Sequence, residues 1–262
     1  MRNLPMMKDL FSLKGRTALV TGGTRGIGRM IAQGFLEQGA KVYISGRKAD
    51  SAAKAAAELS KFGTCMALAA DAAGAEGSKK LADAYLAKEK SLDILVHNAG
   101  AAWGAPFKEF PESGWDKVMD LNVKTPFFLT QALHGALAAN AAADRPAKVI
   151  VIASVDGFFV NRTNESYSYH ASKAGVLHLV KRMAMHLIKD HIVVSAINPG
   201  AFPTDMNRVA RDTPDAWLAH IPAKRIGKPD DIAAAAVYLA SRAGDYVVGT
   251  AITVDGGVSW GY

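Results

Sequence analysis

Short apolar runs and longer amphipathic stretches alternate along the whole chain. The runs are rich in Val, Ile, Leu and Ala and predict buried strands at 16–20, 41–45, 65–69, 92–96, 149–152, 192–197 and 251–254. Between them, apolar residues recur at helical spacing and predict helices from about residue 27 and at 51–60, 76–88, 114–139, 169–189 and 230–240. This alternation predicts an α/β fold, a doubly wound parallel sheet with helices on both faces.

A glycine-rich turn connects the first strand to the first long helix. Its glycines are spaced G-x-x-x-G-x-G at Gly22, Gly26 and Gly28. Such a turn lets the backbone approach a pyrophosphate, which the helix N-terminus then holds. The sequence therefore predicts a Rossmann-type dinucleotide site, with a tight turn that binds nothing as the alternative. The expected contacts in the turn are Gly22, Thr24, Arg25, Gly26, Ile27 and Gly28.

The end of the second strand indicates which dinucleotide binds. Dinucleotide folds that use NAD place a carboxylate about 20 residues beyond the glycines, where it binds the ribose hydroxyls. Here that place holds Gly46 and Arg47. Arg47 can pair with the 2′-phosphate of NADP, and Arg25 can add a second charge. NADP(H) is therefore the predicted cofactor, with NAD(H) as the less favoured alternative.

Tyr169 and Lys173 are the candidate chemical groups. Residues four apart lie on one face of a helix, and a Lys ammonium beside a phenol favours the phenolate and lowers its pKa. Tyr169 is thus a candidate general acid/base. Ser154, after the strand 149–152, can donate a hydrogen bond to a carbonyl oxygen. Because carboxyl ends of parallel strands share one edge, the polar groups that follow strands are expected to meet there; they are Asp71, Asn98, Ser154 and 198–200.

Composition limits the other possibilities. We expect an N-terminal arm at 1–14 and one catalytic domain at 15–262, with a mobile substrate lid at about 203–224. The net charge of +7 is scattered, which argues against nucleic acid as a partner. The sequence has no apolar run long enough for a membrane span, no His pattern typical of a metal site, and a single cysteine, Cys65. A reducing compartment, the cytoplasm, is expected.

Taken together, these motifs resemble the short-chain dehydrogenase/reductase family over nearly the whole of 16–257, and most of all its NADPH-dependent β-ketoacyl reductase branch. The motif residues are Thr21, Gly22, Gly26, Gly28, Asp71, Asn98, Ala99, Gly100, Asn122, Ser154, Tyr169, Lys173, Pro199, Gly200 and Thr204.

The resemblance implies a ketone–alcohol oxidoreductase that acts on a small-molecule substrate as a homotetramer. Tyr169 would be the proton donor or acceptor and Ser154 would orient the substrate oxygen. Lys173 would lower the pKa of Tyr169 and hold the nicotinamide ribose, and Asn122 would support a proton-relaying water. Cofactor contacts are implied for Asp71 at the adenine, Asn98 and Gly100 in the cleft, and Pro199, Gly200 and Thr204 near the carboxamide.

Some features leave alternatives open. His97 replaces the first Asn of the usual Asn-Asn-Ala-Gly motif, and the loop from Ser154 to Tyr169 is longer than in typical β-ketoacyl reductases. From the residues alone, Asn122 is either a capping or core amide or part of a proton path, and His170 is interpreted as incidental. The aromatic residues Trp103, Phe158, Phe159 and Phe202 either line an apolar substrate pocket or pack in the core or an interface.

The substrate class is equally open. A 3-oxoacyl thioester, another apolar or cyclic ketone, and a sugar all fit. Two other functions are weighed against the NADP(H)-dependent enzyme: an NAD-dependent alcohol dehydrogenase of the same family, and a dinucleotide-binding regulator without catalysis.

Overall fold

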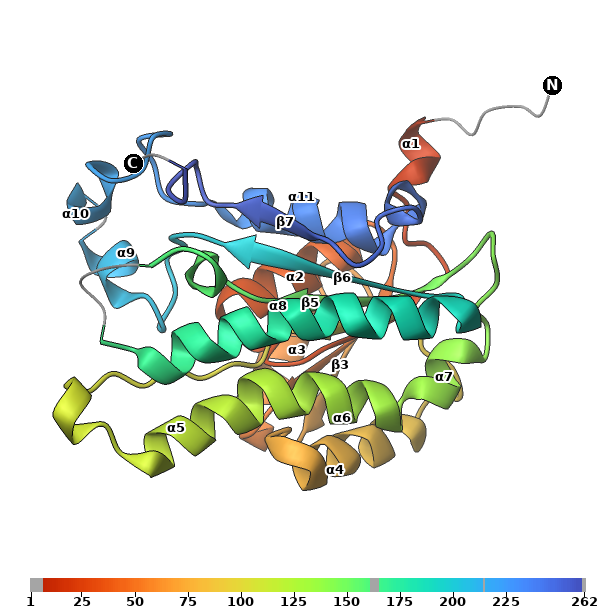
Figure 1. Ribbon diagram of the computed structural model, residues 1–262. Helices are drawn as coiled ribbons and strands as arrows, with labels where there is room; N and C mark the ends of the chain where they lie inside the picture. The colour runs from red at the N-terminus through yellow and green to blue at the C-terminus, as the bar shows by residue number, and fades with distance from the viewer. Residues whose placement is uncertain (1–6, 161–164, 214, 261–262) are drawn as a thin grey trace.

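A single parallel sheet forms the centre of the protein. The computed structural model describes residues 7–160, 165–213 and 215–260 (Figure 1). Within these residues the sheet has seven strands in the order β3-β2-β1-β4-β5-β6-β7. The strands are β1 (Thr17–Val20), β2 (Lys41–Gly46), β3 (Cys65–Ala69), β4 (Ile94–His97), β5 (Ala147–Ile152), β6 (Ile192–Pro199) and β7 (Ala251–Val254). The predicted doubly wound Rossmann-type fold is confirmed.

Helices cover both faces of the sheet, with α8 and α6 running side by side on one face and α2 and α11 on the other (Figure 1). The helices are α1 (Met7–Leu10), α2 (Gly26–Glu37), α3 (Ala49–Leu59), α4 (Gly74–Leu86), α5 (Glu112–Met119), α6 (Thr125–Ala132), α7 (His134–Ala138), α8 (Tyr167–Leu187), α9 (Arg208–Asp212), α10 (Asp215–Leu218) and α11 (Pro229–Ala240). None of the helices in the described ranges is long and apolar enough to cross a membrane.

Two separate cores explain why the strands are apolar on both faces. In β5, Ile150 and Ile152 pack into the core beneath α2 and α11, whereas Val149 and Val151 pack into the core beneath α6 and α8. Successive strand residues point to opposite faces, so a strand with two covered faces is apolar throughout. Leu13, at the end of the predicted N-terminal arm, is fully buried in the first of these cores.

The predicted helix at 114–139 is wrong as a single element. It is divided into α5, a π-helical turn at Asp120–Lys124, α6 and α7. Pro126 accounts for the interruption because it has no N–H to donate to the carbonyl of Asn122, and its ring crowds that carbonyl. Turns of π-helix inside longer helices are frequent at functional sites.

The strand order reverses direction between β1 and β4. These two strands are paired, with Val20 opposite Val96, although α2, β2, α3, β3 and α4 separate them in the chain. Ligands of doubly wound sheets bind beyond the carboxyl ends of the strands at this point. The glycine turn follows β1 and Asn98 follows β4, so both lie at the switch point.

Candidate active site

The glycine turn after β1 takes a backbone path that side chains would block. Gly22 and Gly26 have φ angles of +64° and +56°, in the left-handed region that favours glycine. At Gly28, an added Cβ would lie 2.3 Å from Asn98 Nδ2 and 2.6 Å from the Gly22 carbonyl oxygen. The sequence pattern therefore has two causes here, backbone conformation at Gly22 and Gly26 and close packing at Gly28.

Asn98 and Thr21 fasten the turn to the neighbouring strand. Asn98 Nδ2 donates hydrogen bonds to the carbonyls of Thr21 (2.9 Å) and Gly22 (3.2 Å). Thr21 Oγ1 donates to the Val96 carbonyl (3.2 Å) and accepts from the backbone N–H of Asn98 (2.9 Å). Asn98 thus shapes the cleft by fixing the turn. Thr21 was named only as a motif residue, and its part in fastening the turn was not predicted, because it depends on contacts with the neighbouring strand.

The N-terminus of α2 offers free donors to an anion. Its capping residue, Arg25, makes no side-chain cap, and its first turn contains no acidic residue. The first N–H groups of such a helix are unsatisfied, and the helix dipole favours negative charge there. Thr204 faces this turn, with its Cγ2 3.4 Å from the position of a Cβ on Gly26. The donors fit a pyrophosphate.

The small residue Gly46 and the cationic side chain of Arg47 at the end of β2 fit a phosphorylated ribose. Gly46 packs so closely that a Cβ there would lie 2.6 Å from Thr24 Cγ2. Arg47 is exposed, and none of the ion pairs or hydrogen bonds among the described residues involves its side chain. Arg25 is engaged differently: its guanidinium donates to Asp205 Oδ2 at 2.7 Å.

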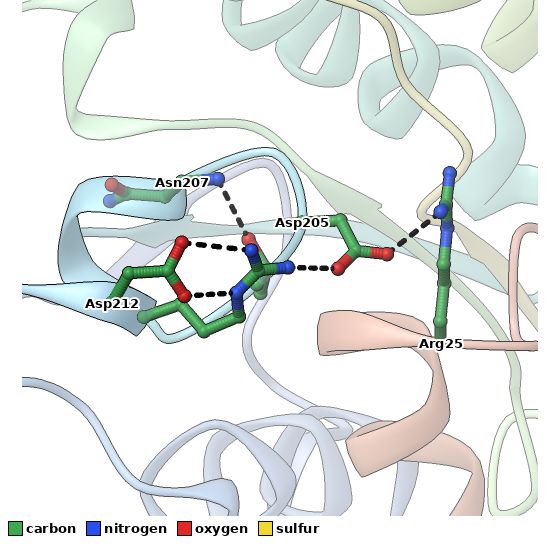
Figure 2. Close-up of polar contacts among 6 residues, drawn as sticks. Arg25, Asp205, Asn207 and Asp212 are labelled. Carbon is green, nitrogen blue, oxygen red and sulfur yellow. Dashed lines mark hydrogen bonds and ion pairs between the residues drawn. The ribbon is translucent and has the colours of Figure 1, made fainter.

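Figure 2 shows this second arginine joined to the segment after β6. Arg25 reaches Asp205, and the same carboxylate accepts from Arg211 at 2.6 Å. Arg211 also binds Asp212 through two hydrogen bonds, of 2.7 and 2.9 Å. These ion pairs connect the glycine turn to α9, within the predicted lid.

Ser154, Tyr169 and Lys173 meet at the carboxyl end of β5. Ser154 begins the 3-10 turn Val155–Gly157, where its Oγ accepts from the Asp156 backbone N–H (3.1 Å). It also forms a side-chain hydrogen bond with Tyr169. Lys173 lies one helical turn further along α8; its Nζ donates to the Ile152 carbonyl (2.8 Å) and lies 5.4 Å from the Tyr169 ring centroid.

Burial governs the protonation of this cluster. It raises the pKa of Tyr169 to about 12, with the hydrogen bond from Ser154 acting in the opposite direction. It lowers the pKa of Lys173 to about 8. The prediction that Tyr169 has a lowered pKa is therefore wrong for this structure, because loss of solvent penalises the phenolate more than its neighbours stabilise it. Tyr169 is held as a neutral phenol, a proton donor.

Asn122 lies in the π-helical turn and is 3% exposed. Its Oδ1 accepts from the Ala101 N–H (2.9 Å), and its Nδ2 donates to the Ala101 carbonyl (2.9 Å) and to Ser172 Oγ (2.9 Å). A Cβ on Gly100 would lie 3.3 Å from Asn122 Oδ1 and 4.0 Å from Lys173 Nζ. Asn122, Gly100 and Lys173 are therefore neighbours, as a common site requires.

The remaining predicted residues lie along the same edge of the sheet. Asp71 follows β3 and is exposed, and its Oδ1 accepts from the Ala73 N–H (3.2 Å). Pro199 ends β6, and Gly200 packs so tightly that a Cβ would lie 2.7 Å from Asp255 Cα. Beside them, Asn198 Oδ1 is buried without a hydrogen-bond partner among the described residues. An unpaired buried acceptor beside the cleft fits a site that receives a ligand.

Comparison with known proteins agrees with this geometry. The sequence model of a family described as enoyl-(acyl carrier protein) reductase matches residues 22–259. The rhamnolipids biosynthesis 3-oxoacyl-(acyl-carrier-protein) reductase of Pseudomonas aeruginosa is 46% identical over 254 residues, 96% of this chain and 99% of that protein. The 5-keto-D-gluconate 5-reductase of Escherichia coli is 35% identical over 256 residues, 96% of this chain and 98% of that one.

The fold comparison gives the same answer. The RhlG/NADP active-site complex of Pseudomonas aeruginosa matches with a TM-score of 0.92 at 46% identity, covering 96% of this chain and 99% of that chain. The chain belongs to the short-chain dehydrogenase/reductase family. The predicted family and its enzyme class, oxidoreductase, are confirmed.

Two polar residues of this short-chain dehydrogenase/reductase were given no role from the sequence. Asp156 and His170 lie beside the catalytic cluster, with Asp156 Oδ1 3.9 Å from His170 Nε2. Asp156 follows Ser154 by two positions and His170 follows Tyr169 directly, so both were visible as neighbours of motif residues. The interpretation of His170 as incidental stays open, since its Nε2 faces Asp156 but has no hydrogen-bond partner among the described residues.

The aromatic candidates for a substrate pocket divide between two roles. Phe202 is 2% exposed and belongs to the core, and Trp103 packs on α5, with its ring 2.7 Å from the position of a Cβ on Gly114. Core packing accounts for Phe202, whereas Trp103 is partly buried and its role stays open. Phe158, by contrast, is 48% exposed near the catalytic turn. No cluster of metal ligands occurs among the residues that the structure places.

Proposed function

We propose that this protein is an NADP(H)-dependent oxidoreductase that interconverts a ketone and a secondary alcohol, with Tyr169 as general acid/base. The observation that carries the proposal is the position of Ser154, Tyr169 and Lys173. All three meet at the carboxyl end of β5, on the same edge of the sheet as the glycine turn. A substrate there lies between the catalytic phenol and a cofactor held by the turn.

The bound cofactor supplies or accepts the hydride. Ser154 and Tyr169 hold the substrate oxygen, where negative charge develops, and so stabilise the transition state more than the ground state. Tyr169 donates its proton to that oxygen during reduction and takes it back during oxidation. Lys173 stabilises the Tyr169 phenolate that reduction leaves behind. Its Nζ lies near Gly100 and Asn122. These two residues support the exchange of the proton with solvent.

NADP(H) is favoured over NAD(H) by the arginines. Arg47 is exposed at the end of β2 and free to pair with a 2′-phosphate, while the position where a carboxylate would bind a 2′-hydroxyl holds Gly46 and Arg47. Arg25 lies within reach of the same cleft, at the start of α2. The NADP bound in the Pseudomonas aeruginosa RhlG complex supports this choice. We assign Asp71 to the adenine and Thr204 to the carboxamide on the family resemblance.

The substrate class follows from the relatives and from one surface feature. The names of the relatives include a 3-oxoacyl reductase and a ketogluconate reductase, so both have a carbonyl as the reacting group. An open cavity of about 290 Å³ lies at the start of α8, and its lining is mainly aromatic: Phe107, Phe110, Pro111, Glu112, Trp115 and Tyr167. Such a lining suits an apolar chain or ring more than a sugar, so we favour a 3-oxoacyl or other apolar ketone.

We further propose a lid, an oligomeric state and a cellular location for this enzyme. Residues 203–224 act as a lid over the site within one catalytic domain at 15–262. The chain forms a homotetramer, which exposed apolar side chains on α6 and just after α8, such as Phe127 and Ile188, support as a contact face. Cytoplasmic location is supported by a single cysteine, Cys65, which is buried and whose pKa burial raises to about 11.

The test combines turnover with cofactor binding. Tyr169→Phe should reduce NADPH-dependent reduction of acetoacetyl-CoA by about 10²–10⁴-fold, because only the proton donor is removed. Its affinity for NADPH, measured by fluorescence titration, should stay within about twofold. Arg47→Ala should weaken NADPH about tenfold and NADH little, as one charge-assisted pair predicts. Near-normal turnover by Tyr169→Phe would refute the catalytic assignment, and equal weakening of both cofactors in Arg47→Ala would refute the 2′-phosphate contact.

A further inference from the structure

Thr125 lies where two segments of the cofactor cleft meet. It is the first residue of α6 and is 1% exposed. On one side is the π-helical turn Asp120–Lys124, which carries Asn122. On the other side is the segment 71–74, which leads from the end of β3 to the start of α4 and begins with Asp71. Under the proposed function, the first segment belongs to the catalytic end of the cleft and the second to its adenine end.

The side chain of Thr125 fastens the segment 71–74. Its Oγ1 donates a hydrogen bond to the Ala72 carbonyl oxygen (2.7 Å) and accepts one from the Gly74 N–H (3.1 Å). Gly74 is the first residue of α4, and an N–H at that position has no partner within its own helix. Because Asp71 directly precedes Ala72, the hydroxyl group of Thr125 fixes the backbone from which the Asp71 side chain projects.

The backbone of Thr125 closes the π-helical turn. Its N–H donates to the carbonyl oxygen of Asp120, five residues earlier, which is the spacing of a π-helix. Thr125 Oγ1 also donates to this carbonyl oxygen (3.0 Å), so one hydroxyl proton is shared between the carbonyls of Asp120 and Ala72. A single residue therefore joins the two segments directly.

Asn122 connects the π-helical turn to the catalytic residues. Its Nδ2 donates to Ser172 Oγ (2.9 Å), and Ser172 directly precedes Lys173 in α8. Asn122 and Ser172 are 3% and 0% exposed, so solvent does not replace this bond. Hydrogen bonds and short stretches of backbone thus connect the segment 71–74 to α8 through Thr125.

We propose that Thr125 is a positioning residue that couples the adenine end of the cofactor cleft to its catalytic end. A ligand that orders the segment 71–74 also orders the π-helical turn, because the same hydroxyl group holds both. The other half of the cofactor then meets Asn122 already in place, so the two halves bind cooperatively. This inference rests on the proposed function, since that function places the adenine at Asp71.

Thr125→Val isolates the contribution of the hydroxyl group. Valine is β-branched like threonine and keeps the backbone N–H that closes the π-helical turn. Thr125→Ser restores a hydroxyl group and should behave as the parent does. Thr130→Val is the matched control, because Thr130 is also buried in α6 and its hydroxyl group donates within the helix, to the Pro126 carbonyl oxygen (2.7 Å).

The direct test uses 2′,5′-ADP, the adenine half of NADP. Hydrogen exchange of the backbone amides at 120–125 is followed by mass spectrometry with and without saturating 2′,5′-ADP. In the parent, Thr125→Ser and Thr130→Val, the ligand should slow this exchange by about fivefold, the lower end of typical coupling between two sites. In Thr125→Val the slowing should disappear. A merely structural role would raise exchange in both states and leave their ratio unchanged.

Cofactor affinity gives the second readout. Calorimetric titration of NADPH and 2′,5′-ADP compares a ligand that contacts both ends of the cleft with one that contacts the adenine end alone. Thr125→Val should weaken NADPH more than 2′,5′-ADP, by about the same fivefold factor, because only NADPH gains from the coupling. Thr125→Ser should restore the parent's affinity for both ligands, and Thr130→Val should bind both as the parent does.

The outcomes separate this inference from the proposed function. Equal slowing of exchange in the parent and Thr125→Val overturns the inference, as do an absence of slowing in the parent and equal weakening of the two ligands. Slowing that depends on the hydroxyl group, in a protein that reduces no ketone, upholds the coupling and rejects the function. If 2′,5′-ADP does not bind the parent, the cofactor assignment and the inference both fail. If Thr125→Val does not fold, Thr125→Ala removes the same hydroxyl group and carries the same test.

Discussion

A buried lysine lies at each end of strand β5, and the two ammonium groups have different partners. Lys148, at the amino end, is 1% exposed, and its Nζ lies 2.7 Å from Asp245 Oδ1. Lys173, at the carboxyl end, is 6% exposed, and its Nζ binds the carbonyl of Ile152. Burial lowers the pKa of both ammonium groups. Lys148 has a carboxylate at contact distance, whereas the Nζ of Lys173 is bound to a neutral carbonyl oxygen.

The surroundings of Lys148 explain its role. Nearby, Asp93 accepts from the Thr17 N–H (2.8 Å) and pairs with Arg145 (2.7 Å) and Arg16 (3.6 Å). Every charge here has a partner that is fixed in the fold, as buried ions require. The amino ends of the strands are therefore held by ion pairs, and the carboxyl ends keep donors and acceptors free for a ligand. A structural lysine therefore lies in β5 at its amino end, and a chemical lysine from α8 reaches its carboxyl end.

Exchanging each lysine for methionine tests this contrast directly. Lys173→Met should lower ketone reduction by about 10²–10⁴-fold, because the phenolate of Tyr169 loses its stabilising charge. Its melting temperature should change little, since methionine replaces an ammonium that was costly to bury. Lys148→Met should do the opposite and lose about 1–3 kcal/mol of stability, because Asp245 is left without its partner. Its turnover should remain within about twofold of the parent.

Turnover assays and thermal unfolding of the two variants measure these effects together. The comparison fails if Lys148→Met is inactive while folded, or if Lys173→Met retains activity. A double variant should show the activity loss of one change and the stability loss of the other, since the two sites do not share partners.

His97 is a useful third case for this comparison. It lies at the carboxyl end of β4, but it is buried, as Lys148 is at the amino end of β5. It is 3% exposed, its Nε2 lies 2.8 Å from Thr130 Oγ1, and burial lowers its pKa to about 3. The histidine that replaces the usual Asn is thus accommodated by packing inside the fold. It has no contact with the catalytic residues in the described structure.

The consequence of this burial is a pH-dependent stability. The unfolded histidine binds a proton near pH 6.5 and the folded one near pH 3, so stability is complete above 6.5 and is lost as the pH falls between these values. From pH 7 to 5, His97→Gln should therefore lose about 2 kcal/mol less stability than the parent. Urea unfolding at the two pH values measures the difference. His178→Gln, exposed on α8, should behave as the parent does; equal acid sensitivity of His97→Gln would contradict the argument.

The fold was largely predictable from the sequence, for a specific physical reason. Strands covered on both faces are apolar throughout, so runs such as 149–152 stand out, and glycines such as Gly22 mark turns that other residues cannot make. The motif residues Ser154, Tyr169 and Lys173 were also identified, because their helical spacing and position after a strand are local properties. All three meet in the structure as predicted.

The errors concern properties that depend on contacts between distant segments. The π-helical turn at 120–124 interrupts a stretch with unbroken helical periodicity, and only Pro126 in that stretch indicated it. The direction of the Tyr169 pKa depends on how deeply the ring is buried, which spacing does not reveal. Asp156 and His170 are 14 positions apart in the sequence, and their proximity follows from the packing of the 3-10 turn on α8.

The smallest expected effect, a change in NADPH affinity, comes from the ion pairs of the proposed lid. These pairs lie at the exposed side of the carboxyl ends of the strands. Arg25 is 72% exposed and Asp205 is 48% exposed, so their pair contributes about 0–1 kcal/mol. Removing the carboxylate releases Arg25 for the 2′-phosphate, and Asp205→Asn should therefore bind NADPH about threefold more tightly and NADH no better. Fluorescence titration of both cofactors measures this difference, which should shrink at high salt.

Asp212→Asn is the matched control for this prediction, since it removes a carboxylate that binds Arg211 and does not contact Arg25 (Figure 2). It should leave both affinities unchanged. The gain in Asp205→Asn should also vanish when Arg25→Ala is added, because the released guanidinium is its cause. Equal tightening of NADPH and NADH would instead mean that the substitution acts by loosening the lid, and Arg25 would then belong with Lys148 among the charges that only hold the structure together.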